Sequence, residues 1–221
     1  MIIVHHLNDS RSQRVLWLLE ELGLAYEVKR YQRDPQTMLA PAELKAVHPL
    51  GKSPVLEDGA VRVAETGAIV EYLLDTHGGS ALRPARGTED GRRVPYWLHY
   101  AEGSAMTPLL LKLIFSQIPQ RVPFLIRPVA KAISRAMTAR MIDPQLTAHT
   151  ALWEAELARS DWFAGDAFSA ADVMMSFPVE AAASRVGFGA DKPRLKAWLE
   201  RIHARPAWQR ALERGGPYSY A

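Results

Sequence analysis

The chain begins with two apolar stretches, the first typical of a β-strand and the second spaced as in an α-helix. Residues 2–5 are rich in β-branched side chains, which predicts a strand. Over residues 15–22, apolar positions recur at helical spacing, with Glu20 and Glu21 on the opposite face. Gly23 then follows as a helix stop. The pattern predicts a strand followed by an amphipathic helix.

The next stretch continues this mixture of strand and helix patterns. "AYEVKRY" (residues 25–31) alternates as a strand does, and a short helical piece and a loop follow it. "SPVLEDGAVRVAE" (residues 53–65) holds two apolar runs joined by Asp58-Gly59, which is a strong hairpin signal. A helix over about residues 65–77 comes next. The order β-α-β-α-β-β-α predicts a small α/β domain over residues 1–80.

From about residue 87 the pattern is helical. Alanine, leucine and arginine dominate, and no convincing strand pattern follows. Proline, glycine and aspartate breaks divide this part into expected helices near residues 88–117, 124–142, 144–159, 169–184, 191–203 and 206–214. We therefore expect an α+β protein, in which an all-helical domain over residues 87–221 follows the α/β domain.

The composition of the chain excludes several classes of function. Of 221 residues, 48% are hydrophobic, which is enough for a substantial core, and the formal net charge is only +3. So small a charge argues against a dedicated nucleic-acid binder. The chain has 0 cysteines, so sulfur chemistry would need a ligand that brings the sulfur. Its histidines do not cluster at metal-ligand spacing, and no metal is expected.

Two apolar stretches are the candidates for a membrane-spanning segment. "TPLLLKLIF" and "DVMMSFPVEAAA" carry charged residues or proline and are shorter than the roughly 20 residues of a bilayer span. The first ten residues lack both the charged start and the long apolar run of a secretory signal. We expect a cytoplasmic protein with no membrane partner.

Polar residues crowd the first turn, "HLNDSRSQR" (residues 6–14). Ser10 stands where the first helix should begin, and Gln13, three residues later, completes a capping-box pattern. Capping is one interpretation, with Gln13 sharing in it. If the Ser10 hydroxyl points outward beside the helix N-terminus, it would instead favour a bound thiolate over a thiol.

A proline opens the strand in "HPLGKSPVLEDG". Proline cannot donate to a strand ladder, so Pro54 belongs at a sheet edge or in a cis turn. Either arrangement would leave the backbone of Val55 free to pair with an extended peptide ligand. A loop with no ligand fits the same residues.

Glu65 and Thr66 stand at the start of the helix in "VAETGAIVEYL". A helix N-terminus carries free N–H groups and a partial positive charge, which can hold a ligand carboxylate, while Glu65 could bind an ammonium group. The alternative is that the two residues cap the helix and complement its dipole.

Taken together and in this order, these motifs resemble the N-terminal domain of cytosolic glutathione transferases. The resemblance rests on "SRSQRVLWLLEELGLAYE", "HPLGKSPVLEDG" and "ETGAIVEYL", and it continues with "YAEGS" and "FSAADVMMSFP". It is closest to the serine-type branch with fungal and bacterial members. It implies a thioredoxin-like domain that binds glutathione and a helical domain that binds an electrophile.

The resemblance also implies roles for individual residues. Ser10 matches the catalytic serine, which donates a hydrogen bond to the glutathione sulfur. Pro54 matches a cis-proline, and Val55 the residue whose backbone pairs with the cysteinyl part of glutathione. The remaining matches are Glu65 and Thr66 at the γ-glutamyl end, and Lys52 and His48 near the glycine carboxylate.

Further residues are candidates for the site. Arg11 or Arg33 would stabilise a thiolate if it lay near the sulfur, although each also reads as a surface arginine. In the "YAEGS" helix, Glu102 could face the cleft or a second subunit. Candidate electrophile-pocket residues are Tyr100, Met106, Leu109 and Leu110.

The implied function is glutathione conjugation to electrophilic small molecules, with hydroperoxide reduction as a possible second activity. Two other functions stay open: a ligand carrier or interaction module of the same fold without catalysis, and a glutathione-dependent isomerase. The expected partners are glutathione, a hydrophobic electrophile and, from the family, a second copy in a homodimer.

Overall fold

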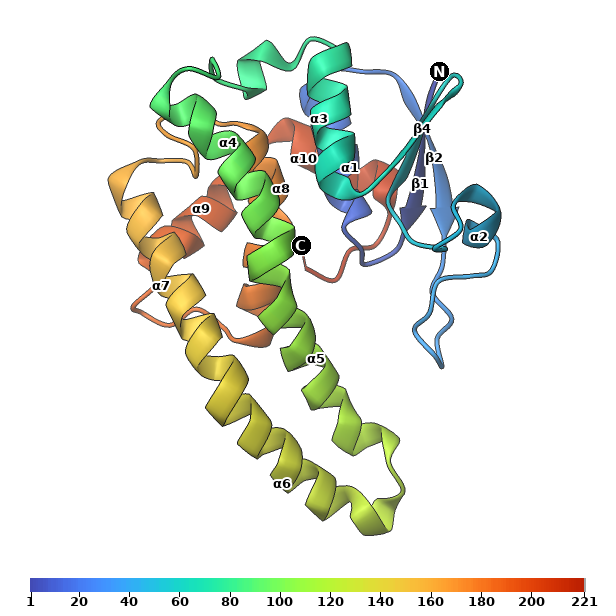
Figure 1. Ribbon diagram of the computed structural model, residues 1–221, viewed down its shortest axis with the longest axis vertical. Coiled ribbons are helices and arrows are strands. Elements are labelled where there is room, and N and C mark those ends of the chain that lie inside the picture. Colours follow the sequence, from blue (N-terminus) through green and yellow to red (C-terminus); the bar gives the residue numbers. More distant parts are fainter. Residues whose placement is uncertain (221) are drawn as a thin grey trace.

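The computed structural model describes residues 1–220 and confirms the expected α+β architecture (Figure 1). The N-terminal part has the expected order of elements. They are β1 (Ile2–Leu7), α1 (Ser12–Glu21), β2 (Tyr26–Tyr31), α2 (Leu44–Val47), β3 (Val55–Asp58), β4 (Val61–Ala64) and α3 (Thr66–Thr76).

The four strands form one mixed sheet in the order β2-β1-β3-β4. β1 runs parallel to β2, as a strand-helix-strand crossover requires, and antiparallel to β3. β3 and β4 form the predicted hairpin, with Gly59 at a φ of 60° in its turn. α1 packs against β1 and α3, and α3 in turn against β3 and β4. This arrangement brings the starts of both helices to the same end of the sheet.

After α3, every element longer than an isolated bridge between Trp162 and Gly165 is helical in the described chain, as expected. Their bounds are η1 (Gly79–Leu82), α4 (Glu89–Tyr100), η2 (Ala101–Ala105), α5 (Met106–Arg121), η3 (Phe124–Ile126), α6 (Arg127–Met137), η4 (Thr138–Ile142), α7 (Asp143–Arg159), α8 (Ala170–Arg185), α9 (Pro193–His203) and α10 (Pro206–Gly215). None of the helices within residues 1–220 is long and apolar enough to span a membrane.

One expected helix break is wrong. The segments near 124–142 and 144–159 form a single helical run from Arg127 to Arg159, although Pro144 lies inside it. Proline removes an i→i−4 hydrogen bond from a helix interior. The π-helical turn η4 lies just before Pro144, so the bonding pattern is already shifted where the proline cannot donate.

The two parts of the protein share one continuous core. α1 packs against both α8 and α10, and Trp17 on α1 is buried together with Trp97, Trp153 and Trp198 of the helical part. The guanidinium of Arg14, also on α1, is 1% exposed and donates to the carbonyl of Met174 on α8 at 2.8 Å. This shared packing holds the cleft between the two parts in a defined shape.

A buried carboxylate organises the helical part. Ser169 and Asp172 form a capping box at the start of α8. Asp172 also accepts hydrogen bonds from the backbone N–H of Phe163 at 3.0 Å and from the indole of Trp198 at 3.1 Å. Burial raises the pKa of Asp172 to about 6, and these hydrogen bonds act against that rise. One side chain therefore joins the start of α8 to the preceding loop and to α9.

Replacing Asp172 tests this role in folding. Asp172→Ala leaves several buried donors without an acceptor, so we expect the free energy of unfolding to fall by about 3 kcal/mol. Urea denaturation followed by circular dichroism measures the change. The control is Asp166→Ala at an exposed aspartate nearby, which should cost less than about 0.5 kcal/mol. Equal losses in the two variants would contradict the assigned role.

Candidate functional site

Ser10 lies in the turn between β1 and α1, within a network of buried hydrogen bonds. Its side chain is 5% exposed, and its Oγ lies 2.7 Å from Oγ of Ser12. Ser12 Oγ in turn lies 2.9 Å from Nδ1 of His6. Burial lowers the pKa of His6 to about 4, so its ring is neutral near pH 7. The Ser10 hydroxyl therefore belongs to a chain of three polar groups.

The expected capping role of Gln13 is wrong. α1 begins at Ser12 with Arg11 as its cap residue, and the Arg11 side chain makes no capping hydrogen bond. Gln13 points into the interior, where its amide atoms have no hydrogen-bond partner within residues 1–220. The capping-box spacing was present, but α1 packs so closely on α10 that Gln13 is buried beside Gly215. Ser10 does accept a hydrogen bond from the backbone N–H of Ser12, at 3.3 Å.

Pro54 adopts the cis arrangement expected for a turn, following Ser53. Ser53 Oγ donates to the carbonyl of His5 at 2.8 Å and accepts from the backbone N–H of Leu7 at 3.1 Å. The same Leu7 N–H lies 3.3 Å from Ser12 Oγ. The cis-proline turn is thus held directly against the Ser10–Ser12 pair.

The expectation of a free Val55 backbone is wrong, and Ser53 takes that place. β3 lies between β1 and β4, so Val55 is in register with His5 on one side and Ala64 on the other. Its side chain is buried as well. Ser53 lies just before the strand, and within residues 1–220 its backbone N–H and C=O make no hydrogen bond in the protein. Those two groups are available to an extended ligand.

The start of α3 has an unusual backbone conformation. Glu65 has a φ of 71°, a conformation that is strained for any residue except glycine, and its side chain makes no capping bond. Thr66 follows as the first helical residue and is buried. The free N–H groups of this helix end and its dipole favour a negatively charged ligand group. The capping interpretation therefore does not account for Glu65.

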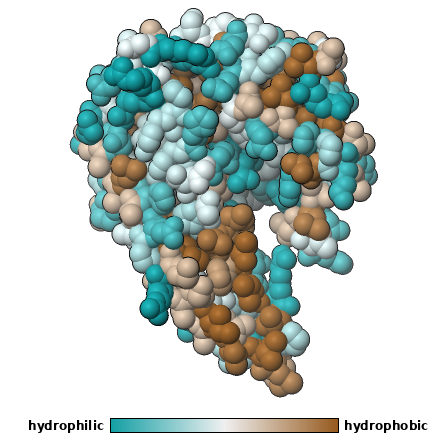
Figure 2. All heavy atoms as spheres, in the orientation of Figure 1, coloured by the Kyte–Doolittle hydropathy of each residue, from teal (hydrophilic) through white to brown (hydrophobic). Residues whose placement is uncertain are grey.

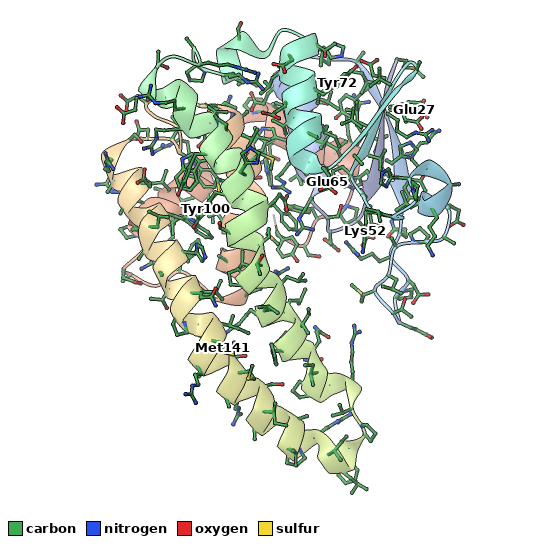
Figure 3. All side chains as sticks on the ribbon, viewed as in Figure 1. Glu27, Lys52, Glu65, Tyr72, Tyr100 and Met141 are labelled. Carbon is green, nitrogen blue, oxygen red and sulfur yellow. The ribbon has the colours of Figure 1, made fainter. Side chains whose placement is uncertain are left out.

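A cavity of about 350 Å³ joins these elements. Figure 3 labels Lys52 and Glu65 on the side of the sheet domain that faces α5. Seven of the predicted residues line the cavity: Arg11, His48, Lys52, Pro54, Glu65, Thr66 and Glu102. Leu50, Ser53 and Ala64 complete its wall. The structure therefore gathers residues that are far apart in the sequence, from both parts of the protein.

Glu102 connects the cavity to the interior. It lies in the π-helical turn η2, forms an ion pair with Arg11 at 2.8 Å, and also binds the buried guanidinium of Arg14. Burial raises the pKa of Glu102, but the charges of Arg14 and Arg11 outweigh that effect and bring the pKa below its ordinary value. An ionised Glu102 therefore holds the Arg11 guanidinium at the cavity wall.

Several candidates lie away from the cavity. Ser10 sits just behind the wall, next to Arg11. Arg33 donates to the carbonyl of Asn8 at 3.2 Å and holds the loop after β2. Tyr100, Met106 and Leu109 are core residues, so their expected place in an electrophile pocket is wrong; Leu110 is exposed. Helical periodicity could not distinguish a face on the core from one on the cleft.

Sequence reasoning missed three residues of this site: His6, Ser12 and Ser53. Ser53 could have been found, because a residue before proline is forced into an extended conformation. His6 and Ser12 carried no comparable signal. His6 is close to Ser12 only because β1 and α1 fold back on each other.

The cavity suits a charged, extended peptide better than a metal ion. Cationic Arg11 and Lys52 and the α3 N-terminus can meet carboxylates, while Glu65 can meet an ammonium group. Among the residues that the structure describes, no group of His, Asp and Glu side chains could hold a metal. A ligand with charged groups at both ends would use all of these features.

Comparisons with known proteins agree with this geometry. Residues 1–75 match the family model described as glutathione S-transferase, N-terminal domain, and residues 122–206 match glutathione S-transferase, C-terminal domain. Glutathione S-transferase 1 of Saccharomyces cerevisiae is 34% identical over 97% of this chain and 95% of its own. Glutathione S-transferase 3 of Schizosaccharomyces pombe is 31% identical over 97% of this chain and 88% of its own.

Solved structures show the same relation. A glutathione S-transferase from Actinobacillus pleuropneumoniae has a TM-score of 0.82 at 34% identity and covers 100% of this chain and 95% of its own. A sphingomonad glutathione S-transferase complexed with glutathione has a TM-score of 0.71 at 26% identity, over 97% and 98% of the two chains. Because both family domains match and relatives align along nearly the whole length, the chain belongs to the glutathione S-transferase family.

Proposed function

We propose that this protein is a glutathione transferase that binds glutathione in the cavity and joins it, through its sulfur, to an electrophilic small molecule. The observation that carries the proposal is the convergence of the cis-proline turn, the α3 N-terminus and the Ser10 turn on one site. The relatives named above, one of them complexed with glutathione, support the choice of ligand.

Glutathione has charged groups that fit the two ends of the cavity. At the α3 end, we place the γ-glutamyl carboxylate on the free N–H groups and Thr66, and its ammonium beside Glu65. The cysteinyl backbone would pair with Ser53. At the opposite end, Lys52 and His48 would meet the glycine carboxylate. This arrangement directs the sulfur toward the Ser10 turn.

Ser10 would act on the sulfur through a hydrogen bond. A hydroxyl that donates to a thiolate favours it over the thiol, and so lowers the pKa of the bound sulfur. The N-terminus of α1 and the Arg11 guanidinium would add positive potential at the same place. The thiolate then forms a bond to the electrophilic carbon, and the leaving group departs with its electron pair. Organic hydroperoxides are a second class of substrate for the same thiolate.

Ser12 and His6 would decide where the Ser10 proton points. The His6 ring donates a hydrogen bond to the backbone carbonyl of Gly215, which places the single proton of the neutral ring on Nε2 and leaves Nδ1 to accept from Ser12. Ser12 then has no proton left for Ser10, so without a ligand Ser10 donates to Ser12 Oγ. In the bound state we turn the Ser10 proton from Ser12 to the sulfur, because a thiolate accepts hydrogen bonds and cannot donate them. Ser12 and His6 are then positioning residues.

We also propose a homodimer, in which the sheet domain of one subunit packs on the helical domain of the other. Exposed apolar residues on the two surfaces support it, such as Val61 on β4 and Tyr96 on α4. A role in detoxification, carried out in the cytoplasm, completes the proposal.

The Ser10→Ala variant tests the catalytic assignment. Loss of a hydrogen bond to a charged sulfur should lower kcat/KM with an aryl halide by about ten- to a hundredfold. Glutathione affinity, measured by calorimetry, should change less than about threefold, because the peptide contacts lie elsewhere. Ser116→Ala, at an exposed serine on α5, is the matched control. Unchanged turnover in Ser10→Ala would refute the assignment.

The Ser12→Ala variant tests the direction of the hydrogen bonds. Because Ser12 Oγ competes with the sulfur for the Ser10 proton, its loss strengthens the bond to the sulfur, and the thiol pKa should fall by roughly 0.5 to 1 unit. The pKa is measured from the thiolate absorbance of the glutathione complex against pH. Ser12→Thr keeps the hydroxyl and should restore the value. A higher thiol pKa in Ser12→Ala would show instead that Ser12 donates to Ser10.

A further inference from the structure

A pair of antiparallel helices projects from the body of the protein. α5 and α6, joined through η3, extend well beyond the other helices (Figure 1). We call residues 110–141 the arm. Figure 2 shows apolar residues gathered along one face of it, down to its tip. The arm lies outside the glutathione cavity and takes no part in the proposed chemistry.

The apolar side chains of the arm are uncovered. At the tip, Phe124 is 73% exposed and Leu125 is 80% exposed. Ile126, Val129 and Ile133 are each more than half exposed. Large apolar side chains gathered in this way on a surface mark an interaction site. Because they project from a convex tip, they fit a medium into which they can insert.

The arm is also strongly basic. No aspartate or glutamate occurs between Glu102 and Asp143, whereas six basic residues do. Lys112 pairs with Asp143 at 2.6 Å. The other five make no ion pair within residues 1–220, and all are exposed: Arg121, Arg127, Lys131, Arg135 and Arg140. The arm therefore carries positive charge that nothing in the described chain neutralises.

Charge and apolar surface are separated on α6. Arg127, Lys131 and Arg135 follow one another at intervals of four, so they form one stripe along the helix. Val129 and Ile133 lie on nearly the opposite side of the helix and are exposed. Only Ser134 of this helix is buried. A helix with one basic and one apolar face, both uncovered, has the pattern of helices that lie in a membrane interface.

We infer that the arm docks on the surface of an anionic lipid bilayer. Its tip would insert Phe124 and Leu125 among the acyl chains, while the arginines and lysine meet lipid phosphates. A second copy fits the arm less well, because a contact through the apolar face would leave the basic stripe on the opposite side of α6 without a partner. The expectation of no membrane partner rested on spanning segments, and surface docking needs none. Docking is also independent of the proposed transferase activity.

Sedimentation of the full-length protein with vesicles tests this inference. At about 0.1 M salt, we expect the protein to bind vesicles of phosphatidylcholine that contain 30% phosphatidylglycerol. Binding to vesicles of phosphatidylcholine alone should be at least about tenfold weaker. Added salt should release the protein from the anionic vesicles. Two arm variants separate the contributions. The apolar variant is Phe124→Ser/Leu125→Ser, and the charge variant is Arg127→Gln/Lys131→Gln/Arg135→Gln.

Each arm variant has a defined expectation. The charge variant should lose about a hundredfold in binding to the anionic vesicles, since each cation contributes about fivefold. The apolar variant should lose at least about tenfold. Conjugation activity and circular dichroism should be unchanged in both, which shows that they fold. The matched controls are Lys29→Gln/Lys45→Gln/Lys196→Gln and Leu39→Ser, at exposed sites outside the arm, and they should bind as wild type.

Three outcomes would overturn the inference. The first is no binding to the anionic vesicles, and the second is equal binding by wild type and both arm variants. The third is a sedimentation-velocity result in which the arm variants turn a dimer into a monomer without any vesicle binding by wild type. That result would assign the arm to an interface between copies of this chain.

Discussion

The buried guanidinium of Arg14 is the contact on which the site depends. It joins α1 of the sheet domain to the carbonyl of Met174 on α8 and to Glu102 in the π-helical turn η2. Burying a charge is costly unless it is paired and hydrogen-bonded, so both partners are required. Glu102 is thereby held in place to fix Arg11 at the cavity wall. One ion-pair network thus sets both the packing of the two parts and the electrostatics of the cavity.

The turn after β1 shows how folding and chemistry use the same groups. Ser10, Ser12 and His6 are buried and hydrogen-bonded to one another, which satisfies the interior of the turn. The same bonds orient the hydroxyl that we assign to the sulfur. Strain at Glu65 has a similar meaning, because a non-glycine residue is held at a φ of 71° beside the cavity. Helix capping alone does not explain the conformation of Glu65, because its side chain makes no capping bond.

Sequence reasoning predicted features that depend on neighbouring residues and missed features that depend on distant segments of the chain. The hairpin at Gly59 follows from local backbone preferences and was predicted. The cis bond before Pro54 was one of two arrangements that the residues left open, and only the resemblance implied it. Val55 was misjudged because its role depends on which strands flank β3, and that is a property of the whole sheet. Gln13 was misjudged for a similar reason, since α10 comes from the other end of the chain to bury it. Patterns of spacing carry no information about such partners.

The sequence by itself determined the order of the elements, the all-helical second part and most of the residues that line the cavity. These follow from hydrophobic period, turn residues and motifs, which act between near neighbours in the chain. Only the tertiary structure decided that Ser53 rather than Val55 presents a free backbone, that Tyr100 serves the core, and that the arm stays uncovered. The physical reason is that burial and pairing are set by distant segments, and their positions are known only once the chain has folded.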